Sequence, residues 1–436
     1  MKKINCTFEN NTKKIYTDFG SSPELLKNLC DWLIRRKDDI VSIDIAFYLF
    51  NNTHFLETLE SLTNCGIKIK IYSIPLEGYD TNKPISIYKY DTEEFIGKFS
   101  KFDCAKIVYE KIKEINNPNL KLFIMPHMYI RSEHVNPFSR GSMPYSLHIK
   151  SFMVEFKSGN ICAGLTSSNF AVRDEHKIEL ACSILLNKNE KEATLDFYKG
   201  LRENSIEIGK FDECENYTHY KIKTRNSVKN IQTGYIAPFY NNSPVEFENF
   251  LIELINAAKN RIVIAAQHVS AYDYSYSERE ITNNNYKKFV KKPGILKYVL
   301  QKANSGIDVS ILSQTYADGQ YHPGIRSPQN TKSFIKFIDA AQKTKNCSYY
   351  VNSKLHAKYI IIDDMAILTT CNFTPSQFIY LPNVNIEHFY NIPNVSYSGI
   401  FCEFGAYYVT DNIETIQTLE AETQEIINLE DTKKFI

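Results

Sequence analysis

The chain has 436 residues, which is enough for two or three domains of average size. Hydrophobic residues make up 43% of it, so large cores are expected. Its 51 basic and 50 acidic side chains nearly cancel, which argues against a protein that binds DNA tightly through its overall charge. Any basic surface must therefore be local.

The ten cysteines are spaced singly, without a C-x-x-C pair or a Cys/His cluster. This spacing predicts reduced thiols in a cytoplasmic protein and argues against a structural zinc site. The first residues contain no apolar stretch of signal-peptide length. No run of about 18 apolar residues predicts a transmembrane helix.

The first half of the chain alternates predicted strands and helices. Its first ~20 residues predict an edge hairpin. A helix is predicted to begin with Ser22 as N-cap and Pro23 at its first position. Strands are predicted over 40–48 and 67–72, with a helix over 53–63 between them.

The second half repeats this order. Ser243 and Pro244 predict another helix start, with Glu246 placed to close a capping box. The elements predicted after it are a strand over 262–266, a helix over 294–305, a strand over 307–312 and a helix over 331–343. The repeated alternation predicts a duplicated α/β domain with a sheet in each half.

The polar stretch 210–242 is punctuated by Gly and Pro and predicts a boundary between domains 1–215 and 216–436. The halves differ most in two insertions. Residues 74–120 are predicted to hold a polar loop and a basic helix, and residues 270–293 a loop rich in Tyr, Asn and Lys.

Each half also contains a short polar motif. His356 and Lys358 begin a strand-like run that ends at Asp363, and His148 and Lys150 begin a similar run that reaches Glu155. Side chains two positions apart on a strand share a face, so each histidine is expected beside its lysine. Matching turns follow, Thr166-Ser167-Ser168-Asn169-Phe170 and Thr369-Thr370-Cys371-Asn372-Phe373.

This repeated pattern resembles the phospholipase D superfamily, whose signature is H-x-K-x4-D followed by G-S-x-N, present twice per active site. The second copy keeps the H-x-K-x4-D spacing. The first has Glu155 in place of Asp, and Thr166 and Thr369 stand where the family usually has Gly. The resemblance implies two mixed sheets flanked by helices, related by a pseudo-twofold axis, with one active site between them.

Two lysines at one site would neutralise the non-bridging oxygens of a phosphodiester. Ser167, Asn169, Thr370 and Asn372 are candidate uncharged donors to the same oxygens. One histidine would attack phosphorus and the other would protonate the leaving oxygen. Residue chemistry does not rank the two, whereas the family implies His148 as nucleophile and His356 as acid. No metal or other cofactor is expected.

The family also places an acid downstream of each motif to orient a histidine. Glu179 and Glu403 lie in strand-like apolar runs and match this role, with ordinary salt bridges as the alternative. Glu155 and Asp363 are equally compatible with a catalytic and a structural role.

The resemblance implies a phosphodiesterase, and we expect nucleic acid as its substrate. Basic residues near an aromatic-rich loop are candidate nucleic-acid contacts, with a solvated surface as the alternative: Lys287, Lys288, Lys291, Lys292 and Arg326. A second hypothesis is a phospholipase D or phosphatidyltransferase acting on phospholipid head groups. A third is a decayed site that only binds phosphate. One chain carries both motifs, so an oligomer is not required.

Overall fold

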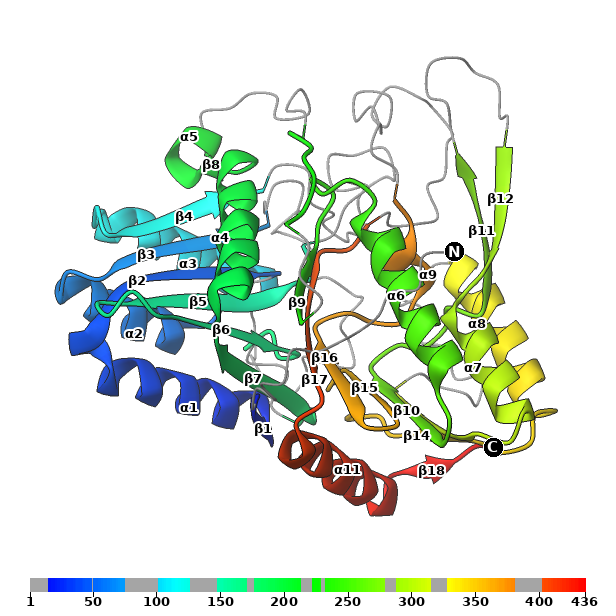
Figure 1. Ribbon diagram of the computed structural model, residues 1–436. Helices are drawn as coiled ribbons and strands as arrows, with labels where there is room; N and C mark the ends of the chain where they lie inside the picture. The colour runs from blue at the N-terminus through cyan, green and yellow to red at the C-terminus, as the bar shows by residue number, and fades with distance from the viewer. Residues whose placement is uncertain are drawn as a thin grey trace.

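The computed structural model describes residues 15–48, 50–74, 101–125, 147–170, 176–212, 222–228, 232–278, 288–314, 328–380 and 402–436. These residues form two eight-stranded sheets and a separate two-stranded sheet (Figure 1).

The first sheet has the strand order β1-β7-β6-β5-β2-β3-β4-β8. Its central strands β2, β3 and β4 run parallel, and the other pairings are antiparallel. The strands are β1 (Tyr16–Gly20), β2 (Ile40–Phe47), β3 (Lys68–Ser73), β4 (Leu120–Ile124), β5 (Lys150–Phe156), β6 (Ile161–Thr166), β7 (Glu179–Leu185) and β8 (Ile206–Glu207). The hairpin predicted at the start of the chain is wrong for β1, because this strand pairs with β7.

The second sheet repeats the first strand for strand. Read from its β9 edge, the order is β9-β17-β16-β15-β10-β13-β14-β18, again with three parallel strands, here β10, β13 and β14. The strands are β9 (Thr233–Ile236), β10 (Arg261–Ala266), β13 (Asp308–Ser313), β14 (Cys347–Val351), β15 (Tyr359–Ile362), β16 (Met365–Thr369), β17 (Gly405–Thr410) and β18 (Lys433–Lys434). The predicted duplicated α/β fold is therefore confirmed.

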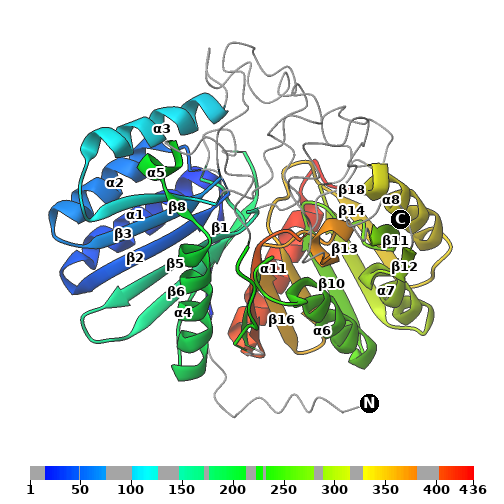
Figure 2. The same ribbon diagram turned by 90° about the horizontal axis from the view of Figure 1, so that it is seen from above.

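Helices flank both sheets. Figure 2 shows α1–α3 on the outer side of the first half, α6–α8 on the outer side of the second, and α4 and α11 toward the middle. In the first half the helices are α1 (Ser22–Arg35), the 3₁₀ turn η1 (Lys37–Asp39), α2 (Thr53–Asn64), α3 (Lys101–Ile115), α4 (Lys188–Glu203) and α5 (Ile208–Asp212). In the second they are α6 (Ser243–Ala257), α7 (Ile295–Asn304), α8 (Pro328–Ala341), α9 (Pro375–Phe378) and α11 (Ile413–Asn428).

Both predicted helix starts are displaced by one residue. The carboxylate of Glu24 accepts hydrogen bonds from the backbone N–H and the hydroxyl of Ser21, which makes Ser21 the N-cap of α1. In α6 the N-cap is Asn242, in a left-handed conformation with φ 59°. The predicted capping box is wrong there, because the Ser243 hydroxyl bonds the backbone N–H and C=O of Ala237 at 3.1 Å each.

The predicted loop over 270–293 is also corrected. Its described part is a two-stranded antiparallel ribbon of β11 (Asp273–Glu278) and β12 (Lys288–Pro293). The alternation of Tyr and Ser in β11 is the period-two pattern of a strand, although no apolar side chain marks it. The described part of the insertion is therefore a ribbon on the second half.

The two halves pack through two helices, and each of these helices contacts a strand of the other half. Helix α4 contacts β9, where the Tyr235 hydroxyl donates to Thr194 Oγ1 at 3.1 Å. Helix α11 contacts β1, and Thr415 Oγ1 donates to the carbonyl O of Ile15 at 3.2 Å. One buried hydrophobic cluster includes residues of both halves. The exact boundary between the predicted domains stays a prediction. Among the described residues, every helix is too short or too polar to cross a bilayer.

Candidate active site

The two motifs meet where the end of the first sheet touches the second half. The residue before β7, Ile178, forms a parallel bridge with Leu355. Its carbonyl O accepts from the backbone N–H groups of His356 at 2.9 Å and Ala357 at 2.8 Å. The start of the second motif is thus hydrogen-bonded to the strand that carries Glu179.

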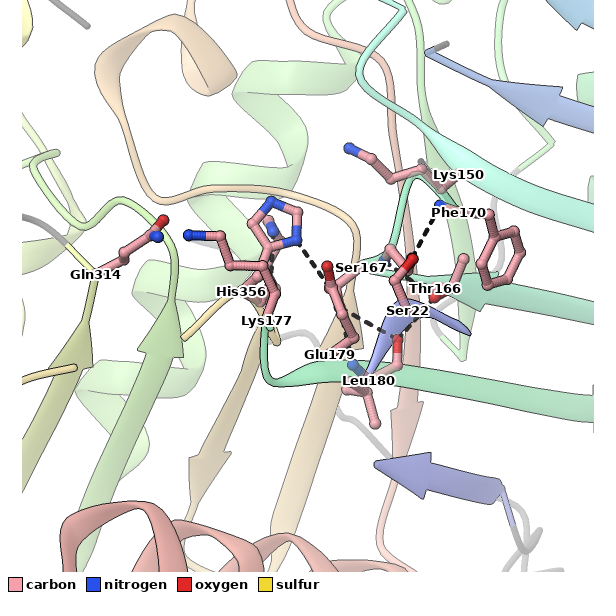
Figure 3. A network of polar contacts seen from close by, with 12 residues as sticks. Ser22, Lys150, Thr166, Ser167, Phe170, Lys177, Glu179, Leu180, Gln314 and His356 are labelled. Atoms are coloured by element: carbon pink, nitrogen blue, oxygen red, sulfur yellow. Dashed lines mark hydrogen bonds and ion pairs between the residues drawn. The ribbon is translucent and has the colours of Figure 1, made fainter. Parts of the chain in front are cut away.

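Glu179 binds the histidine of the opposite half. Its Oε2 lies 2.8 Å from Nδ1 of His356, and the two side chains are 0% and 6% exposed (Figure 3). The Ser167 hydroxyl donates to the same carboxylate oxygen and accepts from the backbone N–H of Leu180 at 2.8 Å. Ser167 therefore positions Glu179, and its predicted contact with phosphate stays a prediction.

Glu403 has the matching place next to His148, with Oε2 3.8 Å from Nδ1. It is held by Ser376 of α9, whose hydroxyl donates to Oε1 at 2.7 Å, and Gln377 Nε2 donates to its backbone O at 3.0 Å. Each acid therefore faces the histidine of the other half. The role of Ser376 was not predicted from the sequence, because its contact with Glu403 forms only when α9 packs beside that residue.

The two motif lysines are fully buried, each at 0% exposure. Lys150 Nζ lies 3.1 Å from His148 Nε2 and donates to the carbonyl O of His148 at 3.1 Å. Lys358 Nζ donates to the carbonyl O of His356 at 2.7 Å. Each lysine therefore contacts its own histidine, although both histidines lie before the strands β5 and β15 and not on them.

Electrostatics link all four motif side chains. Burial lowers the pKa of His148 well below 6.5, and the charges of Lys150, Lys358 and His268 lower it further. Burial also lowers the pKa of His356 well below that value, with contributions from Lys358, Lys150 and Lys177. Without an anion, the site therefore holds neutral imidazoles beside buried positive charge.

In the same environment the pKa of Glu403 shifts upward, in the opposite direction to the pKa values of the two histidines. Burial raises its pKa, although the Ser376 hydroxyl and the charges of Lys150 and Lys358 oppose the rise. The buried positive charge of the site can then be balanced by a ligand that brings its own negative charge. A phosphate group meets this requirement.

The two turns that follow the motifs have matching geometry. Thr166 Oγ1 donates to Leu180 O at 3.0 Å and Thr369 Oγ1 to Ala406 O at 2.9 Å, so the threonines at the family's Gly positions tie each turn to its neighbouring strand. The other turn positions are buried: Thr370 accepts from Ala406 N at 3.0 Å, Asn372 accepts from His268 N at 3.3 Å, and Asn169 is 9% exposed.

The two motif acids are remote from this chemistry. Asp363 accepts from the backbone N–H groups of Lys259 at 2.7 Å, Asn260 at 2.8 Å and Arg261 at 3.0 Å. Glu155 accepts from the Ser42 hydroxyl at 3.2 Å. Of the two roles left open by the sequence, the contacts support the structural one for both residues.

Of the candidate nucleic-acid contacts, the structure describes the side chain of Lys292 alone. Lys292 forms an ion pair with Glu248 of α6, whose carboxylate is fully buried. The charge of Lys292 is therefore paired with a charge inside the protein. The predicted contact of Lys292 with a substrate stays a prediction. Lys288 and Lys291 lie on β12, whereas Lys287 and Arg326 lie outside the described residues. In the described parts of the chain, no group of three or more His, Cys, Asp or Glu side chains could hold a metal ion.

Comparison with protein-family models gives no match, and comparison with curated protein sequences gives none either. Solved structures do match. Phosphatidylserine synthase from Haemophilus influenzae Rd KW20 is similar over 98% of this chain and 90% of its own, with a TM-score of 0.53 and 13% identity. Polyphosphate kinase from Porphyromonas gingivalis matches over 97% of this chain, with a TM-score of 0.50 and 9% identity, and this chain spans 48% of that kinase. Nuc, a phospholipase D family member from Salmonella typhimurium, matches over 47% of this chain with 14% identity and a TM-score of 0.29.

Proposed function

Because the chain has the fold of the phospholipase D superfamily, we propose that it is a phosphodiesterase that acts through a phosphohistidine intermediate. One observation carries the proposal: two histidines from opposite halves, each facing the other half's carboxylate, lie next to two buried lysines. Two imidazoles and two ammonium groups suit a phosphate ester, and they supply the positive charge that a metal ion provides elsewhere.

In the first step, Nε2 of one neutral histidine attacks phosphorus. A nitrogen–phosphorus bond forms as the bond from phosphorus to the leaving oxygen breaks, and the other histidine, protonated, gives its proton to that oxygen. In the second step the latter histidine, now neutral, takes a proton from water. The resulting hydroxide attacks phosphorus and releases the first histidine.

The other groups of the site support these steps. Lys150 and Lys358 bind the non-bridging oxygens, on which negative charge is concentrated during transfer. Glu179 accepts the Nδ1–H of His356 and leaves its Nε2 directed toward the substrate. Glu403 faces Nδ1 of His148 at 3.8 Å, which is longer than a hydrogen bond, and would orient this ring through its charge. We assign His148 as nucleophile and His356 as acid.

We propose nucleic acid as the substrate. A nucleic acid presents a phosphate at every nucleotide, which suits a site that has positive charge beyond the two motif lysines. His268 lies close enough to affect His148, and Lys177 close enough to affect His356. Neither residue belongs to a motif.

The test is a panel of labelled single-stranded and double-stranded DNA and RNA and of phospholipid vesicles, all incubated in EDTA. The wild type is expected to cut nucleic acid, and His148→Ala and His356→Ala are each expected to abolish cleavage. His54→Ala is the matched control, because His54 is exposed on α2 and pairs only loosely with Glu57 at 3.9 Å. Release of a phospholipid head group without nucleic-acid cleavage would assign the site to lipids, and full activity of either motif variant would overturn the mechanism.

A further inference from the structure

Lys177 lies at the edge of the candidate site and outside both motifs. It precedes Glu179 by two residues, on the segment whose backbone bonds the second half at Lys354, His356 and Ala357. Its Nζ donates to the carbonyl O of Ser353 at 3.2 Å, so its side chain crosses from the first half to the second. Figure 3 shows the Lys177 side chain beside the His356 ring.

The exposure of Lys177 distinguishes it from the motif lysines. Lys150 and Lys358 are completely buried, whereas Lys177 is partly exposed. Its charge therefore lies closer to solvent than the charges of the two motif lysines. Its hydrogen bond to Ser353, three residues before His356, holds the ammonium group on the His356 side of the site.

The charge of the substrate also distinguishes Lys177 from the two motif lysines. One phosphodiester carries a single negative charge, and Lys150 and Lys358 already bring two positive charges to it. Lys177 is a third ammonium group, which lies beside His356 and belongs to neither motif. A neighbouring phosphate of the same strand is an anion that such a group binds.

On the basis of the proposed function, we propose that Lys177 is a specificity residue that binds a second, non-reacting phosphate next to the scissile one. The preferred substrate is then a strand with consecutive charged phosphates, and an isolated phosphodiester is a poorer one. The Ser353 carbonyl does not depend on Lys177, because Gln314 Nε2 donates to the same oxygen at 2.5 Å. Replacing Lys177 is therefore expected to leave the local fold intact.

The test uses short single strands whose linkages are neutral methylphosphonates except at chosen positions. One strand keeps a single phosphodiester, and two others keep an additional phosphodiester on its 5′ or its 3′ side. The wild type is expected to cut one of the doubly charged strands with a kcat/KM about tenfold higher per bond, the size of one charged hydrogen bond. The preferred side gives the direction in which the strand runs across Lys177.

Lys177→Met is expected to raise KM for the doubly charged strand about tenfold more than for the singly charged strand, whereas a change in kcat common to both strands would report its effect on the pKa of His356. The same variant should lower the slope of log KM against log salt concentration by about 0.7, the value for one phosphate contact on a single strand. Lys199→Met is the matched control, because Lys199 is exposed on α4 and pairs with Glu203 at 3.9 Å.

Two results would overturn the inference alone: an equal rise in KM on both kinds of strand, which indicates a merely structural role, or no rise on either. A wild type that cuts no nucleic acid in the panel described above would instead overturn the proposed function, and the role of Lys177 with it.

Discussion

Glu179 Oε2 lies 2.8 Å from Nδ1 of His356, although 177 positions of sequence separate the two residues. The carboxylate belongs to the first sheet and the imidazole to the second half. Glu403 and His148 repeat the exchange in the other direction, at 3.8 Å. Each half therefore supplies one histidine and the carboxylate that faces the histidine of the other half. Neither half alone contains the complete site.

The unequal distances predict unequal effects of removing the two acids. Glu179→Gln is expected to lower kcat on the order of 100-fold, because the amide no longer fixes the tautomer of His356 with a charged acceptor. Glu403→Gln is expected to cost less, because the longer distance and the raised pKa of Glu403 already weaken its interaction with His148. Steady-state kinetics on an oligonucleotide would measure both. Equal losses would contradict the asymmetry.

Asp363 is predicted to matter for stability and not for catalysis. Asp363→Ala removes the acceptor of three backbone hydrogen bonds and places a residue without a local polar group at φ 49°. We expect the free energy of unfolding to fall by about 2 kcal/mol, measured by urea denaturation. The kcat/KM of the folded variant should match that of the wild type, and a selective loss of kcat would reassign Asp363 to the active site.

The pH profile of kcat/KM follows from the two histidines. Turnover requires one neutral and one protonated imidazole, and both pKa values lie below the usual 6.5 because of burial and the nearby lysines. Since kcat/KM reports the free enzyme, its maximum is expected below pH 6.5. A series of initial rates at low substrate concentration would test this. A maximum on the alkaline side of neutrality is incompatible with it.

The same pKa values link stability to pH. Because both histidines have lower pKa values when folded, the unfolded chain binds more protons between the folded pKa and about 6.5. The stability that the neutral imidazoles contribute is complete above about pH 6.5 and is lost as the pH falls through this window. The variant with His148→Gln and His356→Gln should therefore lose less stability between about pH 7.5 and pH 5 than the wild type does. Parallel unfolding curves for the two proteins would argue against the lowered pKa values.

The sequence was sufficient to predict the duplicated α/β fold and the pairing of each histidine with its lysine. Both features are local: the two halves repeat the same order of elements, and only one residue separates each histidine from its lysine. The ribbon of β11 and β12 was missed because its alternation is polar, so hydrophobic periodicity gave no signal.

The cross-pairing of acids and histidines could not be predicted in the same way. It depends on how two separately patterned halves dock, which no local pattern encodes. Ser376 and Lys177 were missed for that reason, since their contacts with Glu403 and Ser353 exist only after the halves or the second turn have packed. Ser167 was assigned to phosphate because its partner Glu179 lies on a different strand.

The central claim is that His148 and His356 act on one phosphorus atom, and a crystal structure with bound vanadate tests it most directly. The account predicts a single vanadate in covalent contact with Nε2 of one histidine, hydrogen-bonded to Nε2 of the other and contacted by Lys150 and Lys358. Vanadate bound to one histidine, with the other ring turned away and out of contact, would contradict it.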